Sequence, residues 1–116
     1  MRLSRGQGDA QSTWRALGTL ADVHRHDGRL DEAAPLTEEA LALATARGQG
    51  WWIAQGVRQL GLIAAARGQE TRAVQLLEES LHLWESIGAT RGPHWVLLEL
   101  GRIVYGQGDV ERGRTR

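Results

Sequence analysis

The sequence repeats itself every 40 residues, and this period constrains the fold more than any other feature. The segment GRLDEAAPLTEEALALATARG (28–48) aligns without gaps with GQETRAVQLLEESLHLWESIG (68–88), and eight of the 21 positions are identical. Further residues recur at the same spacing: Gly28, Gly68 and Gly108; Leu20, Leu60 and Leu100; Gly61 and Gly101. Such periods are typical of arrays in which each unit packs only against its neighbours. We therefore expect one stacked array.

Each unit is expected to contain two helices. In the second unit, apolar residues follow helical spacing from Val57 to Ala64 and again from Ala73 to Trp84, with ARGQET between the two stretches. Gly68 can adopt a positive φ at little cost, so we expect it to end the first helix. The predicted fold is all-α, a solenoid of stacked antiparallel helical hairpins.

The helix starts are predicted from caps and prolines. Thr71, and Asp31 one repeat earlier, are expected to cap the second helices of their units through backbone N–H groups. Pro93 fits the first turn of a helix, where its missing N–H costs nothing. Pro35 predicts a delayed or irregular helix start, because a proline in a helix interior removes a backbone hydrogen bond.

The period divides residues 1–116 of this single domain into about two and a half units. They cover residues 13–52, 53–92 and a truncated 93–116, while residues 1–12 are interpreted as the tail of an earlier unit. Gly61 and Gly101 are expected where neighbouring helices approach most closely, so a leucine at Gly101 should overpack that contact. Leu97, Leu100 and Val104 are expected to be half covered. Either the parent protein is longer and covers this face, or the chains self-associate through their terminal helices.

Composition excludes several function classes. There is no cysteine, which rules out disulfides, thiolate metal sites and cysteine nucleophiles. Fourteen basic residues balance fourteen acidic ones, so no overall charge directs the chain to nucleic acid or to an anionic membrane surface. No apolar stretch approaches membrane-spanning length and no secretory signal is present, so a cytoplasmic location is expected.

No group of residues in the sequence indicates catalysis or metal binding. His24 and His26 with nearby aspartates could suggest a metal site, but residues two apart on a helix point in nearly opposite directions. Glu38-Glu39 and Glu78-Glu79 recur at one position of the repeat, which favours a solvated helix face over a pair of catalytic carboxylates. The glycine-containing segments GQGDA and GQGDV lack the lysine of a phosphate-binding loop. We expect no enzyme activity and no cofactor.

The five tryptophans lie near expected helix starts and loops between units, where rings can wedge between hairpins. Trp84 continues the apolar stripe of its helix and is predicted to be in the core. Trp51 and Trp52 are adjacent, so they cannot both face inward equally. Packing is therefore the expected role of most of these rings.

Within each unit, large, small and glycine residues recur at positions that resemble the signature of the tetratricopeptide repeat. The resemblance covers about residues 13–113. The second unit matches best, the third matches in its first helix, and the first has polar residues at some aromatic positions. The matching positions are Val57, Leu60, Gly61, Ala64, Ala73, Leu77 and Ser80; Leu97, Leu100, Gly101 and Val104; and Leu17, Leu20, Ala21, His24, Ala33, Thr37 and Ala40. The 40-residue unit is similar to the long units of bacterial signal-transduction ATPases and multidomain transcriptional regulators.

The resemblance implies a concave surface lined by first-helix residues outside the packing signature. In this chain those are Arg15, Asp22, Arg25, Gln55, Arg58, Gln59, Trp95, Glu99, Arg102 and Tyr105. Arginine together with aromatic residues is common in binding hot spots and suits a peptide with acidic or aromatic groups. An ordinary polar face remains the alternative for this set of residues.

Two functions therefore remain open. The first is a non-enzymatic scaffold that binds a protein or peptide segment on its concave face. The alternative is a structural or sensory part of a longer bacterial transcriptional regulator or signal-transduction ATPase.

Overall fold

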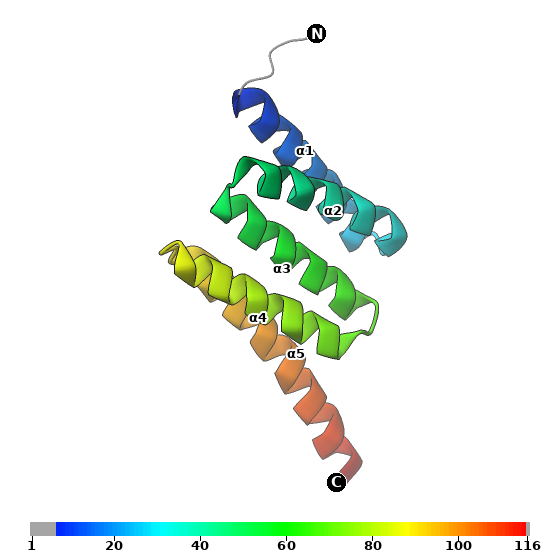
Figure 1. The fold of residues 1–116 in the computed structure, drawn as a ribbon. Coiled ribbons are helices and arrows are strands. Elements are labelled where there is room, and N and C mark those ends of the chain that lie inside the picture. Colours follow the sequence, from blue (N-terminus) through cyan, green and yellow to red (C-terminus); the bar gives the residue numbers. More distant parts are fainter. Residues whose placement is uncertain (1–6, 116) are drawn as a thin grey trace.

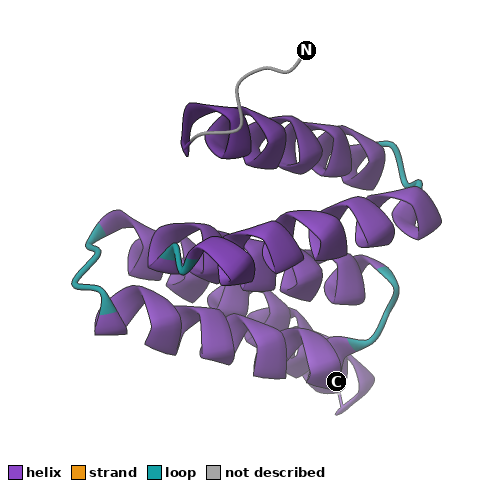
Figure 2. Ribbon diagram, turned by 45° about the horizontal axis from the view of Figure 1, so that its top comes forward, coloured by secondary structure: helices purple, strands orange, loops and turns teal. Residues whose placement is uncertain are grey.

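The computed structural model describes the backbone of residues 7–115 and the side chains of residues 10–104. Along this part of the chain five α-helices follow one another, joined by short turns (Figures 1 and 2). They are α1 (Gln7–His26), α2 (Leu30–Arg47), α3 (Gly50–Ala66), α4 (Glu70–Ser86) and α5 (Arg91–Thr115). The all-α prediction is confirmed.

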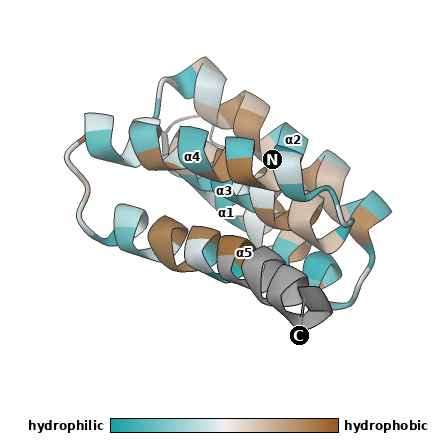
Figure 3. Cartoon of the chain, turned by 90° about the horizontal axis from the view of Figure 1, so that it is seen from below, coloured by the Kyte–Doolittle hydropathy of each residue, from teal (hydrophilic) through white to brown (hydrophobic). Residues whose placement is uncertain are grey.

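Each helix packs against the next one along the chain. In the phase of the 40-residue period, α1–α2 and α3–α4 are the two helical hairpins of the described array. Helix α3 also contacts α1 and α5, whereas α2 and α4 do not meet. The first helices of successive hairpins therefore lie side by side. Figure 3 shows hydrophobic and hydrophilic positions alternating along the helices, the pattern of amphipathic helices that pack on one side.

Every described turn is built around a glycine with a positive φ. Gly28, Gly48, Gly68 and Gly88 have φ values of 81°, 65°, 80° and 73°. The residue after each glycine donates its backbone N–H to the carbonyl oxygen five residues earlier, at 2.8 to 3.1 Å. This is the helix-ending arrangement in which glycine avoids the steric cost of the left-handed region. The prediction for Gly68 is confirmed, and the turns recur every half period.

The predicted helix caps are wrong. Helix α2 begins at Leu30 and α4 begins at Glu70, with Arg29 and Gln69 at the N-cap positions and no side-chain cap hydrogen bond. Asp31 and Thr71 therefore already lie inside their helices. The cause is the tightness of the glycine turns, which reverse the chain so quickly that the next helix starts before the expected cap.

Pro35 does not delay its helix, contrary to the prediction. It lies exposed within α2, five residues after the first residue of that helix. The backbone hydrogen bond that it removes would have ended on the carbonyl oxygen of Asp31, an exposed residue in the first turn of α2. Pro93 is the third residue of α5, so the prediction of a first-turn proline is confirmed.

Small residues dominate the described core, and they allow the helices to approach closely. Ala21, Ala33, Ala54 and Ala73 are fully buried. Helices α3 and α4 are further joined by a hydrogen bond of 2.8 Å, which the buried Ser80 hydroxyl donates to the carbonyl oxygen of Ala54.

The two repeat-related glycines have different surroundings. A Cβ at Gly61 would lie 2.9 Å from Leu77 Cγ, which confirms the predicted close approach. The prediction for Gly101 is wrong, because Gly101 is exposed and a Cβ there would have no atom within 4 Å. Helix α5 packs on α3 and α4 through its other side.

The apolar residues of α5 differ in how far they are covered. Leu97 and Val104 are exposed, and Leu100 is half-buried. Self-association through this face stays a prediction.

Four of the five tryptophans form one packed cluster across α1, α3 and α4. The rings of Trp14 and Trp52 are stacked with centroids 4.9 Å apart, and Trp51 meets Trp84 edge to face at 5.0 Å. Trp84 is fully buried, Trp52 is buried and Trp51 is exposed, as the sequence predicts.

The carboxylates of Glu38-Glu39 and Glu78-Glu79 are exposed on α2 and α4, which confirms the predicted solvated face.

Candidate binding groove

A hollow of about 590 Å³ opens between α1, α3 and α5, and we call it the concave groove. Thr37 and Ala40 of α2 contribute to its lining. Eight of the ten residues predicted for the concave surface line it: Arg15, Asp22, Arg25, Gln55, Arg58, Gln59, Glu99 and Arg102. Trp95 lies outside the groove, beneath the guanidinium of Arg58. The Tyr105 side chain lies outside the described residues.

Small residues keep the groove hollow. Gly18 of α1, Gly56 of α3 and Ala40 of α2 all line it. A Cβ at Gly56 would lie 3.1 Å from Leu41 Cδ1, so α2 and α3 meet closely just behind this wall. Ala40 was predicted only as a packing position of the repeat. Sequence reasoning missed Gly18 and Gly56 because neither glycine recurs at the 40-residue period. The available signal was their place one helical turn from predicted surface residues.

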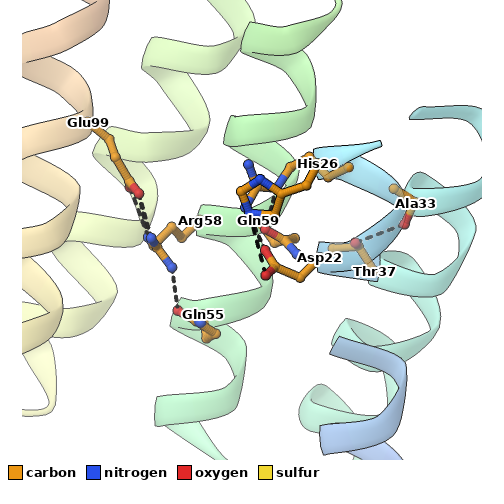
Figure 4. Close-up of polar contacts among 9 residues, drawn as sticks. Asp22, His26, Ala33, Thr37, Gln55, Arg58, Gln59 and Glu99 are labelled. Carbon is orange, nitrogen blue, oxygen red and sulfur yellow. Dashed lines mark hydrogen bonds and ion pairs between the residues drawn. The ribbon is translucent and has the colours of Figure 1, made fainter. Parts of the chain in front are cut away.

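Arg58 and Glu99 join α3 to α5 across one side of the groove (Figure 4). Arg58 Nε donates to Glu99 Oε1 at 2.8 Å, and Arg58 Nη2 donates to Glu99 Oε2 at 2.5 Å. The side chains are only 19% and 14% exposed, and Arg58 also donates to Gln55 Oε1 at 3.3 Å. This two-point pairing matches the planar fork of arginine to the carboxylate. Arg58 is thus committed to contacts inside the protein.

Arg25 makes the corresponding link between α1 and α3. Its Nε donates to Gln59 Oε1 at 3.1 Å, and its Nη2 donates to Asp22 Oδ1 at 2.5 Å. His26 Nε2 lies 3.7 Å from Asp22 Oδ2, so this carboxylate faces two basic side chains (Figure 4). Together with the Arg58–Glu99 pair, these bonds hold the three first helices in a fixed relation.

The remaining two groove arginines are different. Arg15 and Arg102 are exposed, and neither has a hydrogen bond or an ion pair with a residue of the described part of the chain. The groove lining holds four arginines but only the acidic residues Asp22 and Glu99, which are both paired. The surplus positive charge of the groove therefore lies on Arg15 and Arg102.

The described residues give no sign of a metal centre or of a membrane segment. Within residues 10–104 no three histidine or acidic side chains come together in a way that could hold a metal ion. His24 is half-buried whereas His26 is exposed, so the two rings differ in their surroundings. None of the helices described above is long and apolar enough to cross a membrane.

Comparison with known proteins agrees with this geometry. A family model described as "Tetratricopeptide repeat" matches residues 13–46 and 58–87, together more than half of the chain. The chain belongs to the tetratricopeptide repeat family. The two matched segments lie in the α1–α2 and α3–α4 hairpins, so the family match and the observed array coincide. No curated protein and no solved structure gives a significant match.

Tetratricopeptide repeats generally mediate interactions between proteins, and the family is typically a scaffold without enzyme activity. Their function depends on the surfaces that the array presents. In this tetratricopeptide array the concave groove collects most of the polar side chains predicted for recognition.

Proposed function

We propose that this chain is a non-enzymatic scaffold that binds a peptide or protein segment in the concave groove. The observation that carries the proposal is the pair of unpaired arginines, Arg15 on α1 and Arg102 on α5, in a groove whose other charges are paired. A guanidinium without an internal partner is available to a ligand, whereas Arg25 and Arg58 would first have to release a carboxylate.

The chemistry of the groove favours an acidic segment. Carboxylates accept paired hydrogen bonds from the planar guanidinium, and such charged pairs steer association when salt is low. The whole chain has no net charge, so this attraction is local to the groove. That locality favours a protein or peptide over nucleic acid, whose long phosphate backbone is bound by extended basic surfaces.

The internal pairs of the groove favour binding in a second way. Because Arg25 and Arg58 tie α1 and α5 to α3, the walls are ordered before a ligand arrives. A pre-ordered surface loses less conformational entropy on binding, so a larger share of each contact appears as affinity. In this proposal the ion pairs of the groove hold its walls in place, and the unpaired arginines contact the ligand.

The test is a selection from a library of short random peptides displayed on phage, followed by dissociation constants for the enriched peptides. The expected peptides are rich in aspartate and glutamate. The double variant Arg15→Ala, Arg102→Ala should raise the dissociation constant by about 10- to 100-fold, the effect of removing charged hydrogen bonds at an interface. Arg47→Ala, Arg72→Ala is the matched control, because it removes two exposed arginines outside the groove.

Two results would oppose the proposal. If the groove variant and the control bind the enriched peptides as tightly as the unmodified chain does, the ligand lies elsewhere. If repeated selections enrich no peptide, the groove has no recognition role, and a purely structural part in a longer bacterial regulator or signal-transduction ATPase becomes the better hypothesis.

A further inference from the structure

A second hollow of about 520 Å³ lies where α4 ends and α5 begins, beside the start of α3. It is lined by Trp51, Ile87, Trp95 and residues 88–92, and we call it the aromatic recess. Its volume is within the range of sites that bury organic ligands. No step of the proposed function uses it.

The walls of the recess are exposed but held in place. Trp51, Ile87 and Trp95 are 45%, 44% and 38% exposed, and they are among the large apolar side chains that the array leaves in contact with water. The Trp51 ring meets Trp14 and Trp84 edge to face, with centroids 5.9 and 5.0 Å away. Rigid aromatic walls that are already ordered bind an apolar group at a low entropic cost.

The hollow exists because residues 88–92 carry little side-chain volume. Gly88 turns the chain with a positive φ, and Gly92 is buried directly against Trp84. A Cβ at Gly92 would lie 2.1 Å from a ring atom of Trp84, so only glycine lets α5 start this close to α4. Ala89 and Thr90 complete the small-residue floor. The recess therefore follows from the way α4 meets α5.

The recess adjoins the concave groove where Arg58 lies over Trp95. The Arg58 guanidinium lines the groove, and its Cζ lies 5.7 Å from the centroid of the Trp95 ring, which lines the recess. None of the residues that line the recess is acidic, and Arg91 adds a positive charge to its rim. An apolar floor with a basic rim is complementary to a large apolar side chain that has acidic neighbours.

We infer that the aromatic recess is an anchor subsite for one large apolar side chain, aromatic or leucine-like, of the same acidic peptide segment that the groove binds. The inference rests on the proposed function, since the acidic groups of that segment face Arg15 and Arg102 while its apolar side chain enters between Trp51, Ile87 and Trp95. Apolar anchors in pre-formed pockets commonly supply a large part of the affinity of an interface.

The test uses the peptides enriched by phage display and, for each, a version with its large apolar residue replaced by alanine. Ile87→Ser should weaken binding of the original peptide by about tenfold or more and of the alanine version by less than about twofold. Leu98→Ser is the matched control, because Leu98 on α5 is also a large exposed apolar residue, 54% exposed against 44% for Ile87, but lines neither hollow. Ile87→Ala serves as a milder second variant, and circular dichroism checks that each variant is folded.

The outcomes separate this inference from the proposed function. If Ile87→Ser and Ile87→Ala bind like the unmodified chain while the Arg15→Ala, Arg102→Ala variant does not, the groove binds the ligand and the recess is not a subsite. If sedimentation shows that the unmodified chain associates and Ile87→Ser does not, with peptide binding unchanged, a second copy occupies the recess and the inference fails. If no peptide is enriched, the proposed function and the inference fall together.

Discussion

The role of a helical glycine in this array depends on whether a neighbouring helix packs against it. Gly61 and Gly101 are repeat-related, yet only Gly61 meets another helix, through Leu77. Gly92 makes the closest approach to the core, although the repeat does not single it out. The period locates equivalent positions on helices, but whether a neighbouring helix covers a position depends on the packing of the whole array.

Gly92→Ala and Gly101→Ala should have opposite effects on stability. The methyl group at Gly92 would overlap the buried Trp84 ring, so overpacking should lower the free energy of unfolding by about 1–3 kcal/mol. The methyl group at Gly101 enters open space in a helix, so it should raise the free energy of unfolding by about 0.5–1 kcal/mol. Urea denaturation measures both, and equal effects would contradict the packing described for α5.

The positions of the groove side chains were easier to predict from the sequence than the pairs that they form with one another. The sequence predicts Arg58 and Glu99 on the concave surface, and both line the groove, but the prediction treats both as available to a ligand. Their separation of 41 residues, close to one period, was the usable signal, because residues one period apart lie on neighbouring first helices. Arginine and glutamate at that spacing can reach each other.

At the scale of helices, the Arg58–Glu99 pair should be a measurable tie between α3 and α5. A double-mutant cycle with Arg58→Ala, Glu99→Ala and both together should give a coupling free energy of about 1–3 kcal/mol, because each single variant leaves a poorly hydrated charge unpaired. The pair Arg67–Asp31 joins exposed side chains and should show no measurable coupling. An equal coupling free energy in both cycles would mean that burial does not strengthen the Arg58–Glu99 pair.

The helices themselves were predictable from sequence, whereas their first residues were not. Helical spacing of apolar residues and the glycine at each turn identify the elements, and Gly68 ends its helix as expected. Thr71 and Asp31 fit the usual rule for caps, but the glycine turns leave only one residue before the next helix. Local turn geometry thus overrode the preference of these side chains for the cap position.

At the scale of the whole molecule, the phase of the repeat predicted half of the residues that line the concave groove. Residues that a first helix does not use for packing must face the same side of a stacked array, which explains why eight of the ten lie together. The aromatic recess was not predictable in this way. It is formed by the turn between α4 and α5, outside the regular packing positions, and depends on Gly92 fitting against Trp84.

In the proposed function, the side formed by α1, α3 and α5 is the recognition surface. The most direct measurement is a map of backbone amide chemical-shift changes in the ¹⁵N-labelled chain, saturated with an acidic peptide from the phage selection. We predict changes along these three helices around Arg15, Gln55 and Arg102, extending to Trp95. Changes confined to the outer faces of α2 and α4, around Glu38 and Glu78, would contradict the account.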